Sequence, residues 1–275
     1  MIEKLPFSNP IPETKLAIDA ALKAGEAVMK IYDQDFLILQ KEDRSPITKA
    51  DIMSNEIIEN TLSASGHLIL SEESTDRIEN RLGCKKIWII DPLDGTTDFV
   101  NKTGEFTIMI ALVVDNYPVM GVICHPIEKK LYVAQKGQGA YCYYNEKWVR
   151  LKVSKTSILS QCRAVGSRFH QSQHERNFLK TLGILEFTSR GSSLKVLDIC
   201  CARAEFYFTT TNKINQWDTC ASSCLVAEAG GKMTDMSGDP LKYNTKIVNH
   251  QNGILVSNKA IHEDLVQKYS EFIKP

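Results

Sequence analysis

The stretch WIIDPLDGTTDF, residues 88–99, carries an apolar strand directly into two aspartates. Asp91 and Asp94 stand three residues apart, so their carboxylates repel each other unless a positive charge lies between them. Hard oxygen ligands of this kind suit Mg²⁺. The carbonyl oxygen of Leu93, in the turn that Pro92 restricts, is expected to point into the same space. The stretch therefore predicts a divalent metal site at the end of a buried strand.

Gly95 and Thr96 follow at once and extend this prediction to an anion. Glycine lets a ligand approach the backbone closely. Thr96 offers a hydroxyl and a free amide at a predicted helix start, and such amides bind phosphate oxygens. The local pattern thus predicts a cradle for a metal ion and a phosphate group.

Two other interpretations of the stretch have to be weighed. Asp, Pro and Gly are ordinary turn residues, so DPLDGT is also compatible with a plain acidic turn. Haloacid dehalogenase-type phosphatases carry D-x-D-x-T after their first strand, but the spacing here is one residue longer and lies well past the first predicted strand. Since the spacing carries the geometry of such a motif, it argues against this second alternative.

Further acids stand at the ends of other predicted elements. Glu72 and Glu73 follow the short strand HLIL, residues 67–70, and Asp218 opens the helix after NKINQW. Loops at element ends are where functional side chains concentrate. Because acids follow two predicted strands and open a predicted helix, the plain acidic turn is a weaker explanation than a metal–phosphate site.

Bulk composition narrows the class of protein. The 275 residues suffice for one large domain or two intimate ones, and 43% hydrophobic with 24% charged residues is typical of globular proteins. Lys and Arg together number 33, as do Asp and Glu, so the net charge gives no argument for binding nucleic acid or an anionic membrane. No apolar run approaches bilayer length, and the N-terminus lacks the apolar core of a secretory signal, which predicts a cytoplasmic protein. The eight cysteines include no C-x-x-C pair and are predicted to be reduced thiols.

The first half of the chain predicts two helices and an antiparallel meander. Apolar residues at helical spacing indicate a long amphipathic helix over residues 11–32. Thr48 is placed to cap a second helix that ends near Leu62. KIWII, residues 86–90, has the pattern of a buried strand, and antiparallel strands joined by turns at DNYP, PIEKK, KGQG and YNEK follow up to about residue 151.

The second half instead predicts alternating strands and helices. CRAVGS, LEFTSR and EFYFTT have strand patterns, whereas QHERNFLKTLG, SSLKVLDICCARA and WDTCASSCLVAEAGG have helix patterns. Gly230 falls near the C′ position of the last helix. The change near residue 150 predicts an α+β half followed by an α/β half.

Taken together, these motifs resemble a known family. LSEES, WIIDPLDGTTDF and WDTCASSCLVAEAGG, preceded by SPITKAD, resemble in the same order the signature regions of the lithium-sensitive, Mg²⁺-dependent phosphatases of the inositol monophosphatase superfamily. The resemblance extends from about Leu16 to Ser257. Within the superfamily, KEDRSPITKAD, LSEE, TGEFTIMIAL and GSSLK look most like the 3′(2′),5′-bisphosphate nucleotidase branch.

The resemblance implies both a fold and an activity. The fold would be a layered α/β/α/β/α sandwich of the inositol monophosphatase and fructose bisphosphatase type. Residues 1–150 would form the half with the antiparallel sheet and the metal motifs, and residues 151–275 would supply Asp218 and a substrate-binding helix. The activity would be Mg²⁺-dependent hydrolysis of the 3′-phosphate of adenosine 3′,5′-bisphosphate, by in-line attack of a metal-activated water.

The resemblance also implies roles for the acids. Glu72, Asp91 and the Leu93 carbonyl would hold one Mg²⁺, and Asp91, Asp94 and Asp218 would hold a second. A third, weaker metal would lie near Glu72.

Catalytic groups follow from the same resemblance. Asp51 and Thr96 would orient or deprotonate the attacking water, with Glu72 as a third catalytic residue. The amides of Gly95 and Thr96 would hold the phosphoryl oxygens.

The rest of the substrate would meet a second set of residues. Ser192 and Lys195, at the GSSLK helix start, suit the 5′-phosphate, although Lys195 taken alone is compatible with an ordinary exposed helix lysine. GSRFH matches the S-R-x-H stretch of the nucleotidases, so His170 would contact the nucleotide, and the alternative is a structural or exposed histidine.

Two positions separate the branches of the superfamily. Inositol monophosphatases usually carry an acid where Thr211 stands here and lack a lysine at the position of Lys195, which favours the nucleotide. The nucleotidases usually have an arginine in the strand before the W-D helix, whereas Lys213 is the nearest base in this chain. The missing arginine puts the substrate contacts in question.

Two further functional hypotheses remain open at this point. The same metal machinery would also serve an inositol monophosphatase or a fructose-1,6-bisphosphatase. A non-catalytic nucleotide or metal sensor on this fold is the third hypothesis, against which the presence of every expected carboxylate argues. In each case the predicted partner is a small-molecule phosphomonoester, with no nucleic acid and no integral membrane segment, and the chain would be a monomer or a homodimer.

Overall fold

The computed structural model describes residue 2 and residues 4–34, 37–40, 46–75 and 78–274. Residues 41–45, which open the KEDRSPITKAD stretch, lie outside these ranges. Within the described ranges, the strands form a seven-stranded sheet, a five-stranded sheet and a small two-stranded one. No helix in these ranges combines the length and the apolar character needed to span a membrane.

The seven-stranded sheet belongs to the first half of the chain. In spatial order it contains β3 (Leu68–Ser71), β4 (Lys86–Asp94), β5 (Thr107–Val114), β6 (Tyr117–His125), β7 (Lys130–Gln135), β8 (Gly139–Tyr144) and β9 (Lys147–Arg150). β3 runs parallel to β4, and every later neighbour is antiparallel. The predicted turns at DNYP and YNEK are confirmed: the two loop residues of each hairpin, 115 and 116 and then 145 and 146, have positive φ, as a type I′ turn requires.

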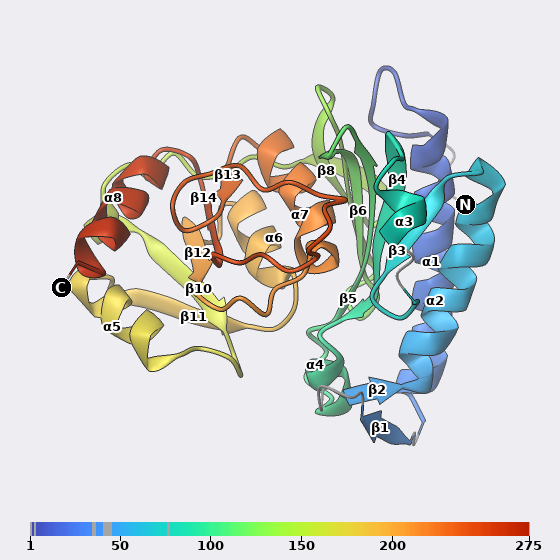
Figure 1. Ribbon diagram of the computed structural model, residues 1–275, viewed down its shortest axis with the longest axis horizontal. Coiled ribbons are helices and arrows are strands. Elements are labelled where there is room, and N and C mark those ends of the chain that lie inside the picture. Colours follow the sequence, from blue (N-terminus) through green and yellow to red (C-terminus); the bar gives the residue numbers. More distant parts are fainter. Residues whose placement is uncertain (1, 3, 35–36, 41–45, 76–77, 275) are drawn as a thin grey trace.

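Two long helices cover one face of this sheet, α1 (Pro12–Tyr32) and α2 (Lys49–Leu62) (Figure 1). The predicted cap of α2 is confirmed, because the Thr48 side chain accepts from the Ala50 amide while Asp51 accepts from the Thr48 amide. β1 (Ile38–Gln40) and β2 (Pro46–Thr48) pair beside the start of α2.

The five-stranded sheet belongs to the second half. Its spatial order is β11 (Glu186–Arg190), β10 (Arg163–Ser167), β12 (Phe206–Thr209), β14 (Ile254–Ser257) and β13 (Lys232–Thr234). Helices α6 (Leu194–Cys200) and α7 (Gln216–Glu228) lie between the two sheets, and α5 (Gln173–Thr181) and α8 (His262–Phe272) cover the outer face (Figure 1). The predicted layered α/β/α/β/α architecture is confirmed.

Alternation along the central strands explains the layers. Ile87 and Ile89 of β4 belong to the core that contains α6 and α7, whereas Trp88 and Ile90 belong to the core under α1 and α2. Successive side chains of a strand point to opposite faces, so a strand that is apolar throughout must be covered on both sides. The seven-stranded sheet is therefore the middle of the molecule.

The structure differs from the sequence-based expectation at the decisive strand. KIWII was expected to end before Asp91, but β4 continues to Asp94 through a register shift, with Asp91 opposite Met109 and Asp94 opposite Thr107. Pro92 fits because the irregular segment leaves its position without a ladder bond to donate. Both aspartates are therefore held by sheet pairing rather than by a free turn.

Several short or late elements were not predicted. They are β1, β2, β13, β14, α8 and the short helix α3 (Ile78–Arg81). β14 lies inside the five-stranded sheet, between β12 and β13, so the second half is not a purely alternating β/α unit. The division of the chain near residue 150 stays a prediction. All eight cysteines lie in the described part of the chain and are free thiols there.

Candidate active site

A cavity of about 380 Å³ opens where the metal motifs meet the second half of the chain. Of the residues predicted from the sequence, ten line it: Glu72, Asp91, Leu93, Asp94, Gly95, Thr96, His170, Ser192, Lys195 and Asp218. The remaining one, Asp51, contacts Thr96. The fold thus brings together side chains that six separate stretches of sequence supply.

Three acids form the centre of the cavity. One carboxylate oxygen each from Glu72, Asp91 and Asp218 lies within 4.8 Å of the others. Glu72 follows β3 and donates its amide to the Ile90 carbonyl at 3.4 Å, so the parallel pairing of β3 with β4 brings it beside Asp91. Asp218 stands in the first turn of α7, where the amide of Asn215 donates to its Oδ2 at 2.7 Å.

The electrostatics of this cluster favour a cation. Burial raises the pKa of Asp91 well above its ordinary value, and repulsion by Glu72, Asp94 and Asp218 raises it further. Burial also raises the pKa of Asp218 well above its ordinary value, and repulsion by Glu72 and Asp94 raises it further. A buried carboxylate set with raised pKa values is compensated when a divalent ion neutralises it, and hard carboxylate and carbonyl oxygens are the donors that Mg²⁺ takes. The residues present therefore fit the metal that the sequence predicts.

Asp94 is held differently from the other acids. Its Oδ2 accepts from the amide of Ser193 and, at 3.3 Å, from the hydroxyl of Thr107. The hydroxyls of Thr107 and Ser193 in turn lie 2.7 Å apart. Burial raises the pKa of Asp94, while Lys195 and the Ser193 amide oppose that shift. One oxygen of Asp94 is thus fixed by the second half of the chain.

A hydroxyl–carboxylate pair borders the acids. Thr96 Oγ1 donates to Asp51 Oδ1 at 2.9 Å and also lies 3.2 Å from the Leu93 carbonyl oxygen. The other oxygen of Asp51 accepts from the amide and the hydroxyl of Thr48, each at 2.7 Å. Burial raises the pKa of Asp51, against the opposing effect of these hydrogen bonds. The predicted Asp51 and Thr96 pair is therefore in contact, and Thr48 fixes the orientation of the Asp51 carboxylate.

The opposite wall carries the predicted substrate residues. Lys195 is not an exposed helix lysine: its Nζ donates to the Ser192 carbonyl at 2.6 Å and lies 5.3 Å from the ring centroid of Tyr207. Burial lowers the pKa of Lys195, and the carboxylates of Asp94 and Asp98 oppose that shift. The charge of Lys195 therefore interacts with the carboxylates of the acid cluster.

His170 lies at the exposed rim of the cavity, where its amide donates to the hydroxyl of Ser167 at 3.1 Å. Its ring is 6.5 Å from the ring of Phe169, which also lines the cavity. Thr211, at the position where inositol monophosphatases usually carry an acid, and Lys213, the base nearest to the missing arginine, line the same cavity.

Sequence reasoning missed two kinds of residue. Thr107 was taken as part of an apolar strand, although a hydroxyl at the start of TIMIALVV is the signal that could have found it. Glu105 and Arg190 gave no local signal, because their contacts join segments 85 residues apart.

Comparisons with known proteins agree with this geometry. The sequence pattern of the inositol monophosphatase family matches residues 10–274. The 3′(2′),5′-bisphosphate nucleotidase CysQ of Escherichia coli (strain K12) is 34% identical over 230 residues, 82% of this chain and 92% of that protein. The crystal structure of CysQ from Bacteroides thetaiotaomicron, a bacterial member of the inositol monophosphatase family, matches with a TM-score of 0.79 at 32% identity, covering 90% of this chain and 97% of that one. An IMPase from Thermotoga maritima matches with a TM-score of 0.81 at 24% identity, covering 96% and 98%, which shows a shared fold.

Proposed function

The chain belongs to the inositol monophosphatase family, and we propose that it is a Mg²⁺-dependent 3′(2′),5′-bisphosphate nucleotidase. Its proposed reaction is hydrolysis of the 3′-phosphate of adenosine 3′,5′-bisphosphate. The observation that carries this proposal is the convergence of Glu72, Asp91 and Asp218 within 4.8 Å. These acids share a cavity with Ser192 and Lys195. The nucleotidase relatives supply the substrate class.

The acids would hold the metal ions. Glu72, Asp91 and the Leu93 carbonyl would bind one Mg²⁺, and Asp91, Asp94 and Asp218 a second, with a third and weaker ion near Glu72. When bound, Mg²⁺ would lower the pKa of water and offset the charge that develops on the leaving oxygen.

The chain's own residues would handle the proton and the phosphate. Thr96 Oγ1 donates to Asp51, so its lone pairs are free to accept from an attacking water. The raised pKa of Asp51 suits a carboxylate that must accept a proton. The amides of Gly95 and Thr96 would hold phosphoryl oxygens in the transition state.

The nucleotide would be recognised on the other wall. Ser192 and Lys195 are proposed to bind the 5′-phosphate and His170 to contact the nucleoside. Thr211 offers a hydroxyl where an acid would repel a second phosphate. This arrangement favours a bisphosphate over the monophosphate of a neutral polyol.

Phosphate release in the presence of Mg²⁺ tests the proposal. Adenosine 3′,5′-bisphosphate, inositol 1-phosphate and fructose 1,6-bisphosphate would be compared side by side. We expect kcat/KM to favour the nucleotide by about a hundredfold, or about 2.7 kcal/mol of transition-state discrimination. A preference for inositol phosphate or fructose 1,6-bisphosphate would assign the runner-up activity to the same metal site.

Loss of one ligand separates an enzyme from a non-catalytic sensor. Asp94→Asn is expected to abolish phosphate release, and unchanged release in this variant would overturn the assignment.

We also expect Li⁺ at millimolar levels or below to inhibit phosphate release by displacing one Mg²⁺. Full activity at about tens of millimolar Li⁺ would count against that hard-cation competition.

A further inference from the structure

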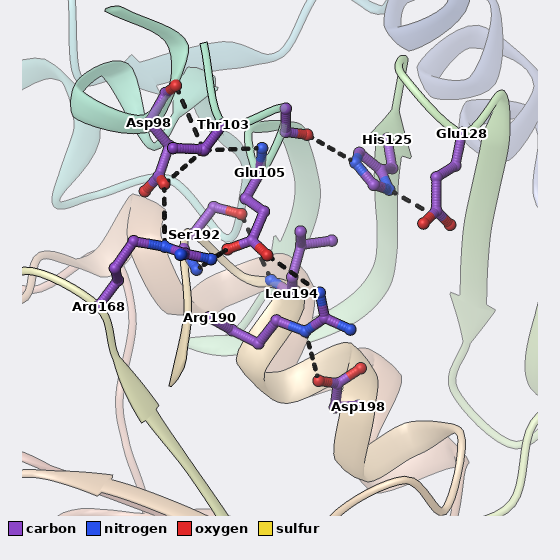
Figure 2. Close-up of polar contacts among 12 residues, drawn as sticks. Asp98, Thr103, Glu105, His125, Glu128, Arg168, Arg190, Ser192, Leu194 and Asp198 are labelled. Carbon is purple, nitrogen blue, oxygen red and sulfur yellow. Dashed lines mark hydrogen bonds and ion pairs between the residues drawn. The ribbon is translucent and has the colours of Figure 1, made fainter. Parts of the chain in front are cut away.

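Glu105, in the loop that precedes β5, connects the two halves of the chain beside the cavity. Its carboxylate accepts from Arg168 Nη2 at 2.6 Å, from Arg190 Nη1 at 3.0 Å and from the Gly191 amide at 2.7 Å (Figure 2). Its side chain is 13% exposed, whereas the side chains of Arg168 and Arg190 are 36% and 37% exposed, so the carboxylate is buried but its arginine partners reach solvent. Burial alone would raise the pKa of Glu105, but Arg168, the Gly191 amide and Arg190 together lower it.

Glu105 contacts a short turn of sequence Gly-Ser-Ser, residues 191–193, which we call the 191–193 turn. Its first amide donates to Glu105. Its middle carbonyl accepts from Lys195 Nζ at 2.6 Å, and its last amide donates to Asp94 Oδ2. The middle residue, Ser192, has a φ of 47°, which a residue with a side chain adopts only under constraint. Charged side chains therefore hold all three residues of the turn.

The packing around the 191–193 turn leaves no room for an added side-chain atom. A Cβ atom added to its glycine would lie 2.3 Å from Asp98 Oδ2 and 2.8 Å from the Glu105 carbonyl oxygen. A Cβ atom added to Gly95 would lie 3.0 Å from that same carbonyl and 3.0 Å from the Ser192 side chain. The Glu105 loop, the turn and the metal motif thus touch one another, and a shift of one displaces the others.

Arg168 and Arg190 do not form an open binding site for an anionic substrate. Arg168 and Arg190 both bind Glu105, and Arg190 Nε also donates to Asp198 at 3.1 Å (Figure 2). Arg168 Nε lies 3.7 Å from Asp98 Oδ1. Since carboxylates already neutralise both guanidinium groups, their role here is to hold Glu105.

We propose that Glu105 is a positioning residue for the metal ligand Asp94, acting through the 191–193 turn. Its carboxylate fixes the first amide of the turn, and the last amide of the turn fixes one oxygen of Asp94. The other oxygen of Asp94 is thereby aimed at the metal site. This inference rests on the proposed function, since it takes Asp94 as a ligand.

The test measures metal binding directly. Mn²⁺ would be titrated into the metal-free chain by calorimetry or by electron paramagnetic resonance. Glu105→Gln keeps the shape of the side chain but removes its charge and one of its two acceptor oxygens, which weakens its hold on the turn and on the arginines. We expect the Mn²⁺ affinity to weaken about 10- to 100-fold, with the Mg²⁺ concentration for half-maximal activity rising in parallel. The KM for the nucleotide at saturating Mg²⁺ should rise as well, because Ser192, which is proposed to bind the 5′-phosphate, stands in the same turn.

Two further variants separate positioning from plain stability. Glu105→Asp keeps the charge and should recover most of the Mn²⁺ affinity. Glu205→Gln is the matched control, because Glu205 is a fully buried carboxylate that binds Arg163 of the five-stranded sheet at 2.7 Å and 3.1 Å. Glu205→Gln should lower the melting temperature and leave Mn²⁺ affinity unchanged.

The outcomes are distinct. If Glu105→Gln lowers the melting temperature as the control does but leaves Mn²⁺ affinity unchanged, Glu105 is only a clamp between the halves and the inference is overturned. The proposed function is judged separately on the unaltered chain. Tight Mn²⁺ binding without phosphate release from the nucleotide would refute the proposed function and leave the role of Glu105 standing.

Discussion

Replacing Asp91 by asparagine should stabilise the metal-free chain while it removes both metal binding and turnover. Asp91 is 1% exposed and lies against Glu72, Asp94 and Asp218. Asparagine keeps the oxygen that accepts from the Leu93 amide at 3.1 Å. Its amide nitrogen can donate to the neighbouring carboxylates, so repulsion is exchanged for hydrogen bonding. The metal cluster, however, loses the ligand that both proposed ions share.

The size of the effect follows from the spacing of the charges. Two unit charges 4.8 Å apart repel by about 3 kcal/mol at an effective dielectric constant of about 20. Proton uptake relieves part of this repulsion in the unaltered chain, since the pKa of Asp91 is raised. We therefore expect a stabilisation of about 1–3 kcal/mol near neutral pH, or a melting temperature about 2–10 °C higher.

The pH dependence has a definite sign. A folded chain in which the pKa of Asp91 is raised binds more protons than the unfolded chain above the ordinary value of 3.8. Stability of the unaltered metal-free chain therefore falls as the pH rises from that value through the raised pKa. The advantage of Asp91→Asn should grow over the same range and vanish at low pH.

Thermal unfolding in EDTA and in excess Mg²⁺ provides the measurement. The unaltered chain should gain about 2.7 kcal/mol at a Mg²⁺ concentration a hundredfold above its dissociation constant, and Asp91→Asn should gain almost none. The control Asp235→Asn keeps the oxygen that accepts two turn hydrogen bonds of 2.9 Å and should keep the full Mg²⁺ gain. A lower melting temperature for Asp91→Asn in EDTA, or an undiminished Mg²⁺ gain, would refute the account of the acid cluster.

Three further predictions concern separate parts of the molecule. His262 is fully buried and burial lowers its pKa from 6.5 to about 4, so its contribution of up to about 3 kcal/mol is complete above pH 6.5 and is lost as the pH falls to 4. Stability measured over this range should be flatter for His262→Gln, and an unchanged profile would contradict the prediction. Gly191→Ala places a methyl group 2.3 Å from Asp98 Oδ2 and should cost about 1–3 kcal/mol in chemical denaturation, together with weaker Mn²⁺ binding. Thr96→Val removes the hydroxyl that donates to Asp51 at 2.9 Å and should lower kcat about 10²- to 10⁴-fold at nearly constant KM. A purely structural Thr96 would instead show normal kcat with a lower melting temperature.

Local signals in the sequence determined many of the parts. Helix spacing and the Thr48 cap predicted α1 and α2, and paired turn residues predicted the meander. Gly230, with a φ of 93°, ends α7 as its position indicated. These features depend on backbone preferences and on hydrogen bonds within a few residues, so they can be predicted from the local sequence.

The metal motif could be predicted from the sequence for the same reason, but its geometry could not. The spacing of Asp91 and Asp94 predicted a metal site, whereas the register shift that holds them in β4 depends on pairing with β5. Asp218 reaches the cluster because α7 crosses β6 at Gly121, where a Cβ atom would lie 2.5 Å from the Ala221 carbonyl oxygen. Nothing within either segment specifies that crossing.

Tertiary structure alone decided which side chains support the site. The Ser193 amide meets Asp94 across 99 residues of chain, and Glu105 meets Gly191 across 86. Such contacts form only once two sheets and the helices between them have packed, because each depends on where a distant backbone lies. The sequence by itself therefore named the acids and their chemistry, and packing of the two halves decided how they are held.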